Sequence, residues 1–161
     1  MMKAIYPALL LVLVTSAPAS ALMRKVSIEE VTAHSSQIVL GTVIEKHAEW
    51  TPTRSIVTTV KVQVEERIMG SSGESYVTIS VPGGEVGEIG LMVSDMPQFE
   101  IGQRALIYLN RSFRPGQHCV AAAFQGKYTL EGGRVLETGA AEHEFVEEVR
   151  VAARNEMERR K

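Results

Sequence analysis

The run Ser55–Arg67 constrains the fold more than any other stretch, because its side chains alternate between two kinds. One set suits a core and consists of Thr58, Val60, Val62 and Val64; the other suits water and consists of Thr59, Lys61, Gln63 and Glu65. Successive residues of a strand point to opposite faces, so the alternation predicts a β-strand with one buried and one wet face. Strands of this kind are typical of antiparallel sheets.

The neighbouring segments predict more strands, separated by turn residues. A β-branched apolar run from Gln37 to Lys46 precedes a polar hinge at 50–53, and the two runs together predict a long hairpin. Further strands are expected at 75–81, 104–110, 119–124, 127–131 and 134–137, with hairpin turns at Gln125-Gly126 and Gly132-Gly133. The pattern indicates a mainly β protein, a small antiparallel barrel of the OB-like type.

A helix is expected on each side of these strands. Ser27 and Glu30 fit a capping box, which predicts a short N-terminal helix from Ile28 to about Ser35. A second helix is expected from Ala140 to Arg159, with acidic residues at its start and basic residues at its end, as the helix dipole favours. Its expected apolar stripe is Val146, Val149, Ala153 and Met157.

The first 21 residues have the character of an export signal. Lys3 supplies a positive start, Ala4–Val14 is a short apolar run, and Ala19-Ser20-Ala21 offers the small residues of a cleavage site. A membrane-spanning helix would need about twenty apolar residues, and Pro7 interrupts this run. We expect a signal peptide over 1–21, one barrel domain over 22–139 and a C-terminal helix over 140–161. The expected location is the periplasm or the extracellular space.

The cysteine content limits the disulfides that can form, and the net charge limits the classes of partner. Cys119 is the single cysteine, so an internal disulfide is excluded, and its apolar surroundings predict a buried thiol. Without Lys3, 16 basic residues face 19 acidic residues, a net charge of about −3. Nucleic acid and, after signal cleavage, the membrane are therefore disfavoured as partners. The oligomeric state stays open.

The glycine-rich stretch Val81–Gly90 resembles a phosphate loop only at first sight. Gly84, Gly87 and Gly90 are spaced G-x-x-G-x-x-G, whereas dinucleotide and P-loop motifs need other spacings and a following helix. Its glycines are expected to permit positive φ in a loop. The segment Pro82–Gln98 is long for a compact domain, so it is expected to cover a barrel mouth or to offer an apolar contact to a partner.

No motif supports catalysis, a metal or a cofactor. The helix sequence His143-Glu144-Phe145-Val146-Glu147 places glutamate where a zinc-protease helix has its second histidine. The other histidines, His34, His47 and His118, are scattered along the chain. Adjacent carboxylates such as Glu65 and Glu66 are expected to point apart on a strand.

An ordered series of short motifs resembles a known family. The motifs are Ser36-x-Ile38-Val39-x-Gly41-x-Val43, Ile56-Val57-Thr58-x-Val60-x-Val62-x-Val64-Glu65 with Gly70, Pro82-Gly83-Gly84-x-Val86-Gly87, Pro97-x-Phe99-x-x-Gly102 and Gln125-Gly126-Lys127-Tyr128. Together they resemble an uncharacterised β-rich domain of bacterial exported proteins, which also occurs ahead of matrixin-like zinc proteases. The resemblance covers about Ser27 to Glu137, and it implies that the partner is an exported protein such as a protease.

The layout is more distantly similar to the netrin-like, OB-type barrels of metalloproteinase inhibitors. Those inhibitors chelate the protease zinc through an N-terminal cysteine, and Leu22-Met23-Arg24 contains none. This likeness therefore implies a fold and not an inhibitory mechanism.

These observations favour an exported, non-catalytic binding or accessory module of unknown ligand. The residues expected to bind lie in the long loop and the hinge: Trp50, Gly83, Gly84, Gly87, Met92 and Phe99. Trp50 is expected to cover the core, with an exposed anchor as the other reading. The alternative function is a secreted hydrolase or metal-binding enzyme, which requires at least three histidines and carboxylates to converge in the fold.

Overall fold

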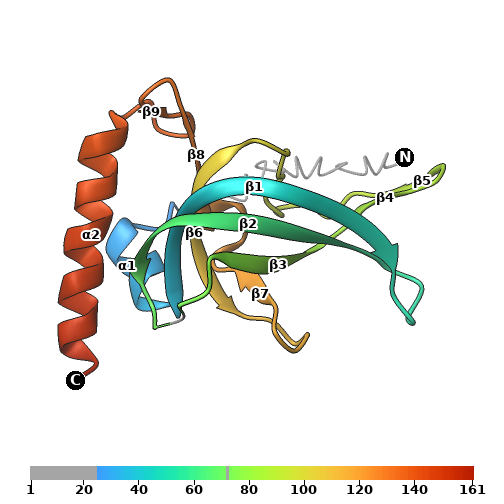
Figure 1. Ribbon diagram of the computed structural model, residues 1–161, viewed down its shortest axis with the longest axis horizontal. Coiled ribbons are helices and arrows are strands. Elements are labelled where there is room, and N and C mark those ends of the chain that lie inside the picture. The colour runs from blue at the N-terminus through green and yellow to red at the C-terminus, as the bar shows by residue number, and fades with distance from the viewer. Residues whose placement is uncertain (1–24, 72) are drawn as a thin grey trace, which may run out of the picture.

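The protein is described by a computed structural model, which covers residues 25–71 and 73–161 (Figure 1). The expected signal peptide therefore lies outside the described residues. In chain order the elements are α1 (Ile28–Ala33), β1 (Gln37–Trp50), β2 (Ile56–Met69), β3 (Tyr76–Pro82), β4 (Gly84–Val86), β5 (Ile89–Leu91), β6 (Arg104–Arg111), β7 (His118–Val120), the 3₁₀ turn η1 (Ala123–Gly126), β8 (Lys127–Glu131), β9 (Arg134–Val135) and α2 (Glu142–Arg159).

The strands close into a barrel in the order β1-β2-β3-β7-β6. Antiparallel pairing of β1 with β6, from Gln37↔Leu109 to Thr42↔Arg104, returns the sheet to its first strand. The contact of β3 with β7 is parallel and is made at Ile79↔His118, as in an OB-type barrel. Strand β8 pairs with β6 beside the barrel. The predicted OB-like barrel with an N-terminal and a C-terminal helix is confirmed.

Buried apolar side chains form two clusters in the described chain, one on each side of the barrel wall. The interior cluster includes Val39, Val60, Val62, Ile79 and Ile107. The outer cluster lies beneath α1 and α2 and includes Ile38, Leu40, Leu106, Tyr108 and Val149. Strands β1 and β6 supply both clusters, because consecutive residues point to opposite faces and both faces are covered. This explains why their sequences read as continuous apolar runs.

The helices pack on one side of the barrel, with α1 between α2 and the strands (Figure 1). Ser27 Oγ accepts a hydrogen bond from the Glu30 N–H at 3.2 Å, which confirms the predicted N-cap. At the other end of α1, the Arg160 guanidinium donates to the carbonyl oxygens of Ala33 at 2.9 Å and Ser35 at 3.1 Å. The same side chain pairs with the buried carboxylate of Glu156 at 2.8 Å. The basic end of α2 thus holds the end of α1.

The stripe predicted for α2 is partly wrong. Val146, Val149 and Ala153 are buried as expected, but Met157 is exposed. Phe145, Ala152 and Glu156 occupy the buried face as well, so the face is centred about one residue earlier than the predicted stripe. None of the helices in the described residues has the length and apolar character needed to cross a membrane.

Two predictions about strands are also wrong. The segment expected as a strand at 119–124 is a strand only over His118–Val120, and Ala122 and Ala123 then take positive φ values of 53°. The predicted hairpin turn at Gln125-Gly126 is the end of η1. Within the long loop, β4 and β5 form a small hairpin that period-two reasoning missed, because each strand has only three residues.

Gly41 lies where two strands approach too closely for a side chain. A Cβ at this buried position would lie 2.2 Å from the Gln63 carbonyl oxygen and 2.9 Å from Val62 Cγ1. The pairing of β1 with β2 shifts register between Leu40 and Gly41, so the backbones crowd at this point. A glycine is required because the obstacle is backbone, which a rotamer change cannot move.

We expect Gly41→Ala to lower the free energy of unfolding by about 2 kcal/mol or more, the usual range for overpacking. Gly73→Ala is the matched control, because a Cβ there meets nothing within 4 Å. Urea denaturation followed by circular dichroism measures both variants. Equal stability of the two alanine variants would contradict the proposed close approach.

Candidate functional site

An open cavity of about 730 Å³ lies between the barrel and the hairpin β4–β5. We call residues 83–93, which carry this hairpin, the arm. The arm and the turn that joins β1 to β2 extend on the side of the barrel opposite to α2 (Figure 1). Lys46, Ala48, Thr58, Val60 and Val81 line the cavity from the barrel strands, and Leu91, Met92 and Val93 line it from the arm.

Two glycines place the arm against the β1–β2 hairpin. A Cβ on Gly84, whose φ is 132°, would lie 2.2 Å from Thr58 Oγ1 and 3.1 Å from Ala48 Cβ. Thr58 Oγ1 donates to the Gly83 carbonyl at 2.7 Å, and the Gly83 N–H donates to the Ile56 carbonyl at 2.9 Å. The glycine-rich stretch therefore first makes a close backbone contact with β2 and then forms the β4–β5 hairpin. The predicted positive φ values are confirmed at Gly83, Gly84 and Gly87.

Phe99 belongs to the floor of this cavity. Its side chain is 3% exposed and packs in the interior cluster, while it also contributes to the cavity lining. At the rim, Lys46 Nζ donates to the Phe99 carbonyl oxygen at 2.9 Å and lies 3.4 Å from Glu100 Oε1. These contacts tie the segment after the arm to β1.

The residues predicted to bind fall into two groups. Gly83, Gly84, Met92 and Phe99 line the cavity, although Phe99 is a core side chain rather than a presented one. Gly87 is in the turn of the arm and Trp50 is the last residue of β1, and neither lines the cavity. Trp50 is 46% exposed and belongs to neither core cluster, so the expectation that it covers the core is wrong.

A buried lysine close to the Phe99 ring was missed. Lys127 is 8% exposed, its Nζ donates to Thr129 Oγ1 at 3.1 Å, and it lies 5.3 Å from the centre of the Phe99 ring. Burial lowers its pKa, and the charges of Glu137 and Glu100 oppose that shift. Alternation along the expected strand 127–131 groups Lys127 with Thr129 and Glu131 on the polar face, so the sequence indicated an exposed lysine.

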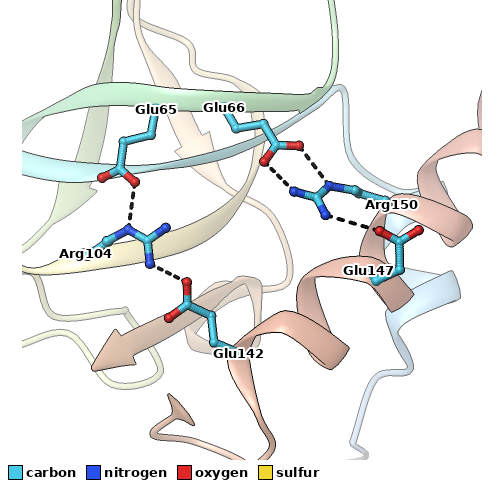
Figure 2. Close-up of polar contacts among 6 residues, drawn as sticks. All are labelled: Glu65, Glu66, Arg104, Glu142, Glu147 and Arg150. Atoms are coloured by element: carbon cyan, nitrogen blue, oxygen red, sulfur yellow. Dashed lines mark hydrogen bonds and ion pairs between the residues drawn. The ribbon is translucent and has the colours of Figure 1, made fainter. Parts of the chain in front are cut away.

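A charged cluster joins α2 to the barrel beside a second hollow of about 390 Å³ (Figure 2). Arg150 binds both oxygens of Glu66, at 2.9 and 2.7 Å, and also Glu147 at 3.1 Å. Arg104 binds Glu65 at 2.7 Å and also pairs with Glu142. Each arginine therefore connects a carboxylate of β2 to a carboxylate of α2.

Glu65 and Glu66 do not point apart, which corrects the expectation for adjacent strand residues. Leu40 pairs with Glu66 and Gly41 pairs with Val64, so Glu65 is the extra residue of a β-bulge. Figure 2 shows both side chains leaving β2 toward the two arginines. Burial alone would raise the pKa of Glu65, but hydrogen bonds from Arg104 and Thr42 lower it overall. The hydrogen bonds from Arg150 lower the pKa of Glu66.

The histidines are not gathered with other metal ligands in the described residues. Across residues 25–71 and 73–161, no group of three or more His, Cys, Asp or Glu side chains is placed to hold a metal ion. Glu147, which occupies the position of a second zinc ligand after His143, is bound by Arg150 and Arg154 instead. His118 Nε2 lies 3.3 Å from Gln37 Nε2. The convergence required by a metal-dependent hydrolase is not met in this part of the chain.

Cys119 is half-buried rather than buried as predicted. Its neighbour Val120 packs toward the interior cluster, so Cys119 faces the other side of β7. Its Sγ lies 3.6 Å from the Arg111 carbonyl oxygen.

No protein-family model matches the chain, and a search of curated proteins finds no similar sequence.

The charged cluster predicts acid sensitivity. The lowered pKa values mean that Glu65 and Glu66 contribute stability above the usual glutamate value of 4.5, and that this is lost as the pH falls through the lowered values. Between about pH 5 and pH 3, we expect the free energy of unfolding to fall less steeply with pH in Glu66→Gln than in the wild type. Urea titrations at several pH values measure the slope.

Glu88→Gln is the control, because Glu88 is an exposed carboxylate of the arm with no ion pair to any other described residue. It is expected to keep the wild-type slope. If Glu66→Gln keeps that slope as well, the cluster does not hold α2 to the barrel.

Proposed function

We propose that the protein is an exported, non-catalytic binding module that holds a segment of a partner protein in the cavity beside the arm. The observation that carries this proposal is the cavity itself, which combines an open mouth with an apolar floor. Its floor includes Val60, Val81 and Phe99, and polar side chains also line it, among them Lys46, Thr58 and Glu85. Apolar surface combined with polar groups that can orient a ligand is a feature of binding sites.

Exposed apolar side chains of the arm support the same role. Met92 is 90% exposed and Ile89 is 56% exposed, and Leu91 is also exposed beside them. Neighbouring apolar residues that stay in water are typical of surfaces that contact another protein. Trp50 is exposed and ends β1, at the β1–β2 turn that extends on the same side of the barrel as the arm (Figure 1). It adds an aromatic residue of the kind found at binding hot spots.

The partner class we propose is an exported protease. Its support is the resemblance of the motif series to a domain that occurs ahead of matrixin-like zinc proteases. A direct test is to mix the purified protein with a matrixin-like protease and to measure complex formation by light scattering. Absence of a complex with such proteases leaves the cavity as the binding site for a different exported protein.

A pair of surface variants tests the binding role. Met92→Asp places a charge beside the cavity, and we expect it to weaken capture of partner proteins from the exported fraction by about tenfold, as for an interface anchor. Phe113→Asp is the matched control, since Phe113 is fully exposed and does not line the cavity. Quantitative mass spectrometry of the captured proteins compares both variants with the wild type.

Both substitutions lie on the surface, so thermal unfolding of the two variants is expected to match that of the wild type. Capture that is equal for all three proteins would refute a binding role for the cavity. Capture that is lost equally in both variants would place the binding surface elsewhere.

A further inference from the structure

The edge of β5 that faces away from β4 carries free backbone groups. The hairpin closes with the pair Val86↔Ile89 around a two-residue turn, so this pair exchanges both hydrogen bonds and the next pair, Glu85↔Gly90, exchanges none. The N–H and C=O of Gly90 therefore point away from β4. In the described chain β5 pairs with β4 alone, and Gly90 is exposed and lines the cavity.

Apart from its short length, this edge lacks the features that usually protect a free strand. Natural edge strands are commonly blocked by lysine, proline or a covering segment, because unpaired groups attract other strands. The residues of β5 are Ile89, Gly90 and Leu91, which carry no charge and are all exposed. The glycine leaves its backbone bare, so another chain can approach to the usual strand spacing of about 4.8 Å.

The charges near this edge indicate what kind of chain would bind. Lys46 is already paired with Glu100, and Lys127 is buried over the Phe99 ring and does not line the cavity. Glu85 and Glu88 have no ion pair with any described residue, and Glu85 lies close to Gly90. The unpaired charge at the free edge is therefore negative, which favours a basic side chain in the ligand.

We infer that the cavity binds an extended peptide, which adds to β5 as a third strand through the Gly90 backbone. Its apolar side chains lie over Leu91 and the cavity floor, and a lysine or arginine lies near Glu85 and Glu88. Backbone pairing supplies affinity in this mode, and side-chain pockets supply specificity. The inference rests on the proposed binding function and names the form of the partner segment.

A pair of substitutions at one position tests the backbone contact. Gly90→Pro removes the outward N–H without removing a hydrogen bond of the hairpin, and Gly90 is not in the positive-φ region that would exclude proline. Gly90→Ala keeps the N–H, and its Cβ would lie 3.4 Å from Cγ of the flexible Glu85 side chain. The two variants differ in the donor and in the bulk at the strand edge.

The probe is a phage-displayed library of random peptides of about seven residues, a common strand length, selected on the immobilised full-length chain. Selected peptides are then synthesised and their affinities measured by fluorescence polarisation. We expect peptides rich in β-branched residues with a lysine or arginine. Affinity is expected to stay within about twofold in Gly90→Ala and to fall about tenfold or more in Gly90→Pro.

Several results would overturn the inference. They are an empty selection, acidic selected peptides, or equal binding by Gly90→Pro and the wild type. A concentration-dependent dimer that Gly90→Pro abolishes, seen in sedimentation, would assign the edge to a second copy of the chain instead. Unaltered far-ultraviolet dichroism and thermal unfolding of Gly90→Pro guard against misfolding; a misfolded variant is replaced by a peptide methylated at alternate backbone nitrogens, which is expected not to bind.

The capture experiment separates this inference from the proposed function. If Gly90→Pro captures the native partner as well as the wild type does while Met92→Asp does not, the binding module stands and strand addition is wrong. If Met92→Asp also captures normally, the proposed function itself fails.

Discussion

The pairing of β1 with β6 is the contact on which the rest of the structure depends. It closes the barrel, and both strands are covered on the two faces, so one pair of strands supplies the interior cluster and the layer beneath the helices. Backbone groups buried in this way need hydrogen-bond partners, and the ladder provides them. Disruption here would open the barrel and remove the support of α1 and α2 together.

The cavity depends on the same barrel for its floor and on the arm for its other wall. The arm is held at its base by Gly83, whose carbonyl oxygen accepts a hydrogen bond from Thr58, and by Gly84, where a Cβ would collide with the same threonine. Its outer strand has no such support. Because the base of the arm is fixed and the edge of β5 is free, the arm can bind another chain without reorganisation of the barrel.

Much of the fold was predictable from the sequence, because alternation in β2 and the turn residues around it report burial directly. The cap at Ser27 and the range of α2 follow from local chemistry and were predicted for that reason. Short elements escaped prediction: β4 and β5 are too brief to show a period, and the chain after Val120 turns through positive φ at two alanines. Glu65 and Glu66 were expected on opposite faces of β2, but the bulge at Glu65 lets both side chains reach the arginines. The bulge could not be predicted from one strand, because register is a property of two strands.

The candidate site was predictable only in part. The length of the segment 82–98 and its apolar residues indicated an exposed contact surface, and Gly83, Gly84 and Met92 do line the cavity. The cavity itself was not predictable, since it needs Lys46 and Ala48 from β1 to meet the arm across a large sequence separation. Lys127 was missed because its burial depends on the position of Phe99.

The hydrogen bonds between Arg160 and the end of α1 bear on the order in which the protein folds. Its hydrogen bond to the Ala33 carbonyl spans 127 positions of the chain. Contacts between residues so far apart in the sequence form late, because the intervening chain must first lose its freedom. Until residue 160 has been synthesised, the carbonyl groups at the end of α1 lack this donor. During synthesis the residues of α1 are therefore made before the contact that fixes the end of this helix can form.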